Sequence, residues 1–452
     1  MIEQSPLKVT IAGASGFVGK NLIKILIQRF KVKALSRQSK ESENPNLKWQ
    51  SVDLFSLHSS HEALKDTDIA IYLVHSMMPS SRLFQGSFHD TDLMLADNFV
   101  KACQSNNVKQ IIYLGGLVPQ GRISAHLESR REVEEVLGST QIPLTVLRAG
   151  MVVGEGGSSF EILRNLVFNL PGMILPKWTE AHTQAIYIED LVRIFDTSIG
   201  NQDFFGKTLD IVNGENLRYK ELIIQTAAHF QKKRILIPVP IDSTSFSKLW
   251  VSLFGNTEYE LVSPLIDSLL CDLPQADPDP LIKDLIHCKT YKSMLEKLPK
   301  SKSKRAYRHQ PVSTDNTVRS IQRLKSGAQF NVNEISEKYM SWLPQHLSPF
   351  IKVTREGDTV HFCSIGISKP LLTLKLVNEL HEVDRIKFHI IGGLLSKTKN
   401  TGWLEFRRVA DGHYMLSSIN DFVPSLPWYV YKLTQAPIHA WVMKCFNLYL
   451  SK

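Results

Sequence analysis

The chain has 452 residues, of which 43% are hydrophobic and 21% are charged. This composition is typical of globular proteins, excludes a disordered, collagen-like or coiled-coil chain, and at this length suggests two or three domains. The five cysteines are scattered and form no CxxC pair, so we expect a reducing compartment, no disulfide scaffold and no metal site. With no run of ~18 apolar residues and no signal-peptide pattern, we expect a cytoplasmic protein.

The net charge of +9 is unevenly distributed. Between Lys300 and Lys325 eight basic residues face one acidic residue, Asp315. Such a run could meet nucleic acid or an anionic membrane, or it could be a solvated linker between domains. Because no aromatic stacking pattern accompanies it, we favour the linker and expect no nucleic-acid partner.

Residues 1–200 alternate short apolar strands with helical segments. Helices are expected at 20–29 and 90–105, and strands at 8–12, 31–36, 47–52, 69–74, 110–114 and 144–148. Strands separated by helices form parallel sheets, and segments such as IAIYLV are apolar on both faces, as a sheet covered by helices requires. The fold class expected for residues 1–200 is therefore α/β, a Rossmann-type doubly wound parallel sheet.

The rest of the chain divides into three parts. Residues 201–298 are irregular and predict an appended, mostly helical lobe on the substrate side, and residues 299–315 predict a basic linker. Residues 316–452 read as a strand, a helix at 332–343, a series of strands between 350 and 422, and a long helix at 426–450 that Pro437 could kink. This order predicts an α+β domain in which an antiparallel sheet grips a long helix.

A glycine motif provides the strongest functional signal. Gly13, Gly16 and Gly19 follow the first strand and open the first helix. Glycines at this spacing allow a tight turn, close approach of a pyrophosphate and close packing of helix on strand, while the helix N-terminus attracts the phosphates. We therefore predict a dinucleotide site that also includes the intervening Ser15, Phe17 and Val18.

The end of the second strand predicts which dinucleotide binds. NAD-specific sites usually place an acidic residue here, but this chain has Ser36, Arg37 and Lys40. Cationic side chains suit a 2′-phosphate, so we expect NADP(H) to be preferred over NAD(H); the alternative is a solvated basic turn.

Other strand ends complete the predicted cofactor site. Asp53 and Leu54 would flank the adenine after the third strand, and His75 and Ser76 follow the fourth. Gly115 ends the fifth strand. Because ligands bind at the carboxyl ends of the strands in open α/β sheets, we include these residues in the cofactor site.

These motifs, with the segments 113–119, 147–166 and 185–192, resemble the atypical extended short-chain dehydrogenases/reductases, in particular the NmrA-like and epimerase-like NAD(P)-binding proteins. The resemblance covers residues 5–300. The C-terminal region resembles the lipid-binding-type helix-grip domain that is fused behind some of these proteins.

The resemblance implies a catalytic Ser, Tyr and Lys, and this chain departs from that set. Its fifth strand ends in two glycines, and the helix that should carry YxxxK has His126 and Arg130 at those positions. His126 could donate a proton and Arg130 could hold the ribose, or the pair could be a remnant of lost catalysis. Ser124 is a candidate replacement for the missing serine.

Three functions remain open from the sequence. The first is an NADP(H)-dependent oxidoreductase acting on a small apolar or carbonyl-containing substrate through HxxxR in place of YxxxK. The second is a redox-inactive dinucleotide sensor or assembly factor. The third is a C-terminal module, regulated by the dinucleotide, that binds an apolar ligand or makes peripheral contact with an anionic membrane. Fold alone does not choose among them.

Overall fold

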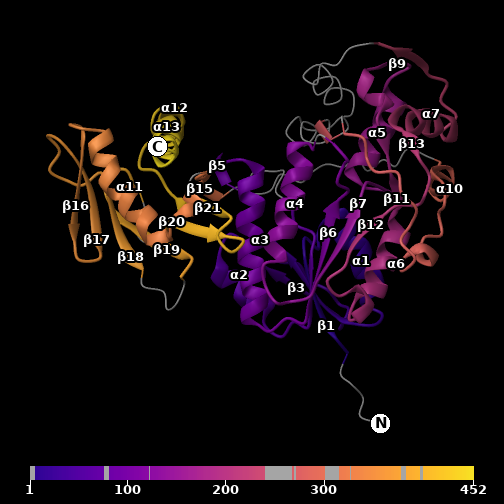
Figure 1. The fold of residues 1–452 in the computed structure, drawn as a ribbon, viewed down its shortest axis with the longest axis horizontal. Coiled ribbons are helices and arrows are strands. Elements are labelled where there is room, and N and C mark those ends of the chain that lie inside the picture. The colour runs from indigo at the N-terminus through magenta and orange to yellow at the C-terminus, as the bar shows by residue number, and fades with distance from the viewer. Residues whose placement is uncertain are drawn as a thin grey trace, which may run out of the picture. The chain divides into compact units, whose positions relative to one another are not determined.

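The computed structural model describes residues 6–75, 81–121, 123–239, 267–268, 271–300, 315–325, 327–377, 383–397 and 401–452. The chain divides into two compact units, drawn in Figure 1, and each is described by itself. The first unit comprises Met1–Met77 and Asn98–Gln310, and the second comprises Met78–Asp97 and Pro311–Lys452. Ser76 of the predicted cofactor site and most of the predicted basic linker lie outside the described residues.

The first unit is built on a seven-stranded sheet in the order β3-β2-β1-β4-β6-β7-β12, and every pairing in it is parallel. The strands are β1 (Lys8–Ala12), β2 (Lys31–Ser36), β3 (Leu47–Ser51), β4 (Ile69–Tyr72), β6 (Gln110–Gly116), β7 (Leu144–Ala149) and β12 (Thr208–Ile211). The predicted Rossmann-type sheet is confirmed. Its seventh strand, β12, comes from the segment predicted as the appended lobe.

Helices, several of them labelled in Figure 1, and short strand pairs complete this unit. The helices are α1 (Phe17–Leu26), α2 (Leu57–Leu64), the second half of α3 (Phe88–Ser105), α4 (Ala125–Leu137), α5 (Ser158–Asn169), α6 (Ile188–Ser198), α7 (Tyr219–His229) and α10 (Tyr291–Glu296). The strand pairs are β8 (Met151–Val153) with β11 (Ala185–Tyr187), β9 (Gly172–Leu175) with β14 (Ile235–Pro238), and β10 (His182–Thr183) with β13 (Leu217–Arg218).

The strands of the central sheet are buried because helices cover the sheet. All four residues of β4 and the last four of β1 are buried, which explains why these strands are apolar on both faces. Leu22 and Leu26 of α1 and Leu191 and Phe195 of α6 lie in the same buried cluster as these strands. This core fixes the positions of the loops at the carboxyl ends of the strands.

The second unit is an eight-stranded sheet in the order β16-β17-β18-β19-β20-β21-β15-β5. Its strands are β16 (Ile351–Glu356), β17 (Thr359–Ser364), β18 (Leu372–Val377), β19 (Arg385–Gly392), β20 (Trp403–Val409), β21 (Tyr414–Phe422), β15 (Asp315–Arg323) and β5 (Ser81–Gln85). Successive strands pair antiparallel except β5, which pairs parallel with β15. The sequence predicted the antiparallel sheet but placed its domain entirely within 316–452, without residues 78–97.

Two helical segments pack against this sheet through an aromatic core. Tyr339 and Trp342 of α11 (Val332–His346) contact Phe446 of α13 (Gln435–Leu450), with ring centroids 5.1 and 5.2 Å apart. The predicted single C-terminal helix is interrupted at Thr434, between α12 (Trp428–Leu433) and α13. Pro437 lies in the first turn of α13; it has no N–H to bond the carbonyl of Leu433, so its position agrees with the expected effect of proline on this helix.

The structure explains why residue 393 is a glycine, which the sequence did not show. Its φ is +120°, and a Cβ there would lie 2.4 Å from the carbonyl oxygen of Leu371. The missing side chain therefore allows the loop after β19 to approach the start of β18.

Among the described residues, no helix combines the length and the apolar character needed to cross a bilayer.

Candidate functional site

The glycine loop lies at the switch point of the central sheet. β1 pairs with β2 on one side and with β4 on the other. The strand order therefore reverses direction at β1, which makes this the switch point. Gly13 follows β1 with a φ of +84°, and a Cβ there would lie 2.9 Å from the backbone of Leu73, which follows β4. The loops after β1 and β4 therefore meet where dinucleotides bind in such sheets.

The same loop fits the pyrophosphate of a dinucleotide. A Cβ on Gly19 would lie 2.6 Å from Gly13 O, so only glycine allows this packing of α1 on the loop. Gly16 is the N-cap of α1, and no side chain among the described residues caps this helix end. The N–H groups in the first turn of α1 can thus donate hydrogen bonds to a bound anion. Ser15 is exposed, and Phe17 and Val18 are half-buried in the first turn.

Phe17 connects this loop to the one after β8. A Cβ on Gly154 or on Gly157 would lie 2.7 or 2.9 Å from the Phe17 ring. Glu161 of α5 accepts a hydrogen bond of 3.2 Å from Gly156 N and thereby fixes this second loop. The two loops are packed against each other, which the sequence did not reveal.

The basic residues after β2 are positioned at the surface. Ser36 is buried, and its hydroxyl donates to the carbonyl oxygen of Gln38, so it shapes the turn. Arg37 and Lys40 are exposed, and the Lys40 ammonium lies 4.4 Å from the centroid of the Trp49 ring. Partial burial and the nearby Lys20 lower the pKa of Lys40. The ammonium groups of Lys20 and Lys40 thus lie close together.

Asp53 and Leu54 form a turn after β3. Asp53 Oδ1 accepts a hydrogen bond of 3.1 Å from Phe55 N, and the Asn98 side-chain amide of α3 donates to Leu54 O at 2.7 Å. The turn is therefore fixed in place, and its role toward the adenine stays a prediction.

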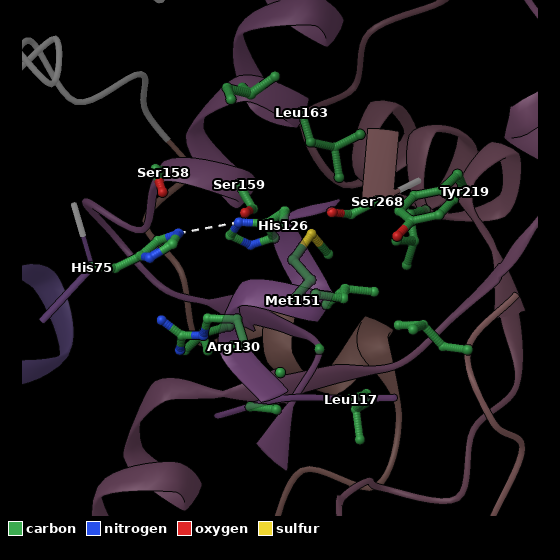
Figure 2. Close-up of a pocket in the computed structure, with 18 of the residues that line it drawn as sticks. His75, Leu117, His126, Arg130, Met151, Ser158, Ser159, Leu163, Tyr219 and Ser268 are labelled. Carbon is green, nitrogen blue, oxygen red and sulfur yellow. Dashed lines mark hydrogen bonds between the residues drawn. The ribbon is translucent and has the colours of Figure 1, made fainter. Parts of the chain in front are cut away.

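A cavity of about 360 Å³ opens at the carboxyl ends of the central strands, as Figure 2 shows. It is lined by Leu73 and His75 after β4, by the end of β6, and by residues 149–152 of the β7–β8 segment. The lining therefore includes the loop after β4, whose Leu73 contacts Gly13. Its other walls come from α4, α5 and α7 and are mostly apolar, with Leu163, Leu166, Leu222 and Ile223 among them.

The cavity brings His75 and His126 together. His75 Nε2 lies 3.1 Å from His126 Nδ1, and the ring centroids are 4.8 Å apart (Figure 2). One of these nitrogens donates and the other accepts, so a single proton lies in the bond between the two rings. The sequence predicted both residues for the site, in separate roles, but not their contact.

Arg130 lies one turn after His126 and also lines the cavity. Its guanidinium donates to the carbonyl oxygen of Leu114 and lies 5.4 Å from the centroid of the Tyr113 ring. Tyr113 Oη in turn donates to Arg130 O at 3.3 Å. The structure therefore ties Arg130 to the end of β6, with part of its guanidinium facing the cavity.

The structure explains why no serine ends β6. A Cβ at Gly115 would lie 2.6 Å from Glu134 Oε1, and a Cβ at Gly116 would lie 2.9 Å from Leu127 Cδ2. Glu134 holds this position because Arg148 Nη2 bonds it at 2.7 Å. An ion pair between buried Glu134 and half-buried Arg148 thus fills the space that a serine would need.

Ser124 does not take the place of that serine in the cavity lining. It is the N-cap of α4, its Oγ accepts from Leu127 N at 3.2 Å and lies 3.0 Å from Ser268 Oγ, and it is buried. The lining includes other polar residues that the sequence did not single out, namely Ser158, Ser159, Trp178, Tyr219 and Ser268. Burial raises the pKa of Tyr219 to about 12, so this phenol stays protonated at neutral pH.

Residues 13–167 match the family model described as NAD(P)H-binding. This part of the chain is thus similar to NAD(P)H-binding domains. This confirms the expected resemblance to atypical short-chain dehydrogenases/reductases for this domain, whereas the narrower NmrA-like assignment stays a prediction. Because the match ends at residue 167, the helix-grip resemblance of the C-terminal region also stays a prediction.

Two relatives and one solved structure are similar to part of this chain. Auxiliary protein GraX of Staphylococcus aureus is 31% identical over 111 residues, a match that spans 24% of this chain and only 36% of GraX. An N-acetyl-α-D-glucosaminyl-diphospho-ditrans,octacis-undecaprenol 4-epimerase of Escherichia coli is 22% identical over 52% of this chain and 76% of the epimerase. The triphenylmethane reductase of Citrobacter complexed with NADP(H) shares the fold, with a TM-score of 0.51 and 18% identity over 64% of this chain and 99% of the reductase.

Proposed function

We propose that the protein is an NADP(H)-dependent oxidoreductase that reduces or oxidises a small apolar substrate at a carbonyl or equivalent group. The observation that carries this proposal is the His75–His126 pair in a largely apolar cavity beside the glycine loop. A sensor needs the dinucleotide site alone, whereas a hydrogen-bonded pair of titratable rings in an apolar pocket suits proton transfer.

The cavity residues have separable roles in this proposal. A bound nicotinamide would supply or accept the hydride. His126 donates the proton to the substrate oxygen in the reductive direction, His75 passes a proton to His126 through the bond of 3.1 Å, and water returns a proton to His75. Tyr219 stays protonated, so it can donate a hydrogen bond to the substrate but is not the base. Arg130, held on Leu114 O, is a positioning residue for His126 and for the bound cofactor.

The preference for NADP(H) rests on charge. Arg37 and Lys40 follow β2, and Lys20 lies close enough to lower the pKa of Lys40. A 2′-phosphate placed among these cations would relieve their mutual repulsion, whereas the ribose hydroxyl of NAD(H) would not. The match to the NAD(P)H-binding model is compatible with either nucleotide.

The apolar lining guides the choice of substrates. NADPH oxidation should be followed with a panel of apolar aldehydes, ketones, quinones and cationic dyes, using the wild type, His75→Gln and His126→Gln. Loss of the positioned acid should reduce kcat by about 10²–10⁴-fold with little change in NADPH affinity. His58→Gln, an exposed histidine on α2, is the matched control.

The outcomes separate the candidate functions. Wild-type turnover that both variants retain would remove the histidine pair from the mechanism. Tight NADPH binding without turnover of any substrate would favour the sensor.

A further inference from the structure

One end of the second unit's sheet carries a group of exposed apolar side chains. We name this group the apolar tip: Phe350, Ile365, Ile367, Leu394, Tyr429 and Leu433, each between 43% and 77% exposed. They come from the start of β16, the β17–β18 loop, the loop after β19 and α12. Large apolar side chains scattered singly are normal on protein surfaces, but a group on neighbouring loops indicates an interaction site.

Backbone hydrogen bonds connect these loops into one surface. Leu394 N donates to Pro370 O at 3.0 Å, and Ser425 N donates to Leu395 O at 2.9 Å, so the loops before β18, after β19 and before α12 lie side by side. Ile351 pairs with Ser364, which places Phe350 beside Ile365. The apolar tip is therefore held by the sheet and does not depend on independent loop conformations.

The charges around the apolar tip have one sign. Exposed Lys352, Lys369, Lys397 and Lys432 lie on the same segments. Within residues 345–352, 364–371, 393–397 and 422–434, all of which the structure describes, no side chain is acidic. Asp421, which directly precedes the last of these ranges, is bonded to Arg319 at 2.9 Å.

The opposite end of the same sheet has the reverse character. Its turns carry Glu356, Asp358, Asp384 and Asp411, and its exposed apolar residue Val383 stands among them. The acidic residues of these turns thus lie at the far end of the strands from the apolar tip, whereas Asp315 of β15 and Asp421 of β21 lie toward it. A surface that combines exposed aromatic and aliphatic groups with lysines matches the chemistry of an anionic bilayer.

We propose that the apolar tip docks the protein on an anionic phospholipid surface, with the four lysines at the headgroups and the apolar side chains at the acyl boundary. Trp441, 49% exposed on α13 and 5.4 Å from the His346 ring at the end of α11, extends this surface with an interfacial aromatic group. This proposal does not depend on the oxidoreductase proposal.

The test measures binding of the full chain to vesicles by sedimentation. Wild-type protein should bind vesicles of phosphatidylglycerol mixed with phosphatidylcholine, bind phosphatidylcholine alone much less, and dissociate as salt is raised. The double variant Ile365→Ser with Leu433→Ser should weaken binding at least about tenfold. Lys369→Glu with Lys432→Glu should weaken it by about fivefold or more per lysine.

The control is Val383→Ser, which removes an exposed apolar side chain at the acidic end of the same sheet. It should bind vesicles as the wild type does, and all variants should keep wild-type circular dichroism and NADPH affinity. Absence of wild-type binding would overturn the proposal, and so would binding that the tip variants leave unchanged. A wild-type dimer in sedimentation equilibrium that Ile365→Ser with Leu433→Ser dissociates would also overturn it, because the apolar tip would then be covered by a second copy.

Discussion

Arg407 Nη1 of β20 lies 2.8 Å from Asp97 Oδ2 of α3, although the two residues are 310 positions apart in the chain. Both side chains are buried, and Arg407 also lies 3.1 Å from Glu405. Glu405 is bonded in turn by Arg385 and by the Trp403 indole. A charged cluster is thus enclosed within the second unit, and the inserted segment 78–97 supplies one of its members.

Replacement of Asp97 by alanine should strongly destabilise the second unit. Removing one partner of a buried ion pair leaves an uncompensated charge and typically costs about 3–5 kcal/mol. Urea unfolding followed by circular dichroism measures the effect. Glu337→Ala, which breaks the exposed pair with Arg355, serves as the control and should leave the unfolding free energy nearly unchanged.

A fragment of residues 316–452 lacks Asp97 and should therefore not fold as the full chain does. A folded, monomeric fragment would contradict this role of the insertion.

Acid should destabilise the same cluster within a defined pH range. Burial acts to raise the pKa of Glu405, but Arg407 and Arg385 outweigh it and hold this pKa at about 2. Because the folded pKa lies below the unfolded value of about 4.3, the contribution of Glu405 to stability is complete above that value and is lost as pH falls toward 2. Unfolding free energies measured from pH 5 to pH 2.5 should show this loss. The Glu405→Gln variant should be less stable than wild type at pH 5, and its unfolding free energy should depend less on pH between 5 and 2.5. An unchanged pH dependence would show that Glu405 is not the group responsible.

Arg37→Ala and Lys40→Ala should each weaken NADPH binding and leave NADH binding nearly unchanged. A charge-assisted contact to the 2′-phosphate contributes about 1.5–3 kcal/mol. Calorimetric titration of both nucleotides measures the difference, with Lys48→Ala on exposed β3 as the matched control. Equal losses for the two nucleotides would show that these residues do not discriminate between them.

Introducing a serine at Gly115 should destabilise the first unit and should not create a better enzyme. The added Cβ would meet Glu134 Oε1 at 2.6 Å, and such overpacking typically costs about 1–3 kcal/mol. Gly121→Ser, where no atom lies within 4 Å of the new Cβ, is the control. Thermal unfolding of both variants tests the prediction, and a Gly115→Ser protein as stable as wild type would show that the Glu134–Arg148 pair yields easily.

The sequence predicted the elements that local patterns determine. The bounds of β1 and β2 were predicted correctly, because apolar β-branched runs end at turn residues. β5 was missed because its partner strand, β15, begins more than two hundred residues later, and no local pattern reveals such a pairing. At the site, the glycine loop was predictable from spacing. The His75–His126 bond was not, since it depends on how α4 packs beside the end of β4.

The parallel pairing of β5 with β15 has a consequence for biosynthesis. A nascent chain releases residues 81–85 long before Asp315–Arg323 have been translated, so this strand must wait for its partner while the Rossmann-type sheet is being formed. The second unit cannot be completed until the ribosome has almost finished the chain. A nonsense codon after the NAD(P)H-binding domain would therefore leave an unpaired strand edge available for aggregation, instead of a clean one-domain protein.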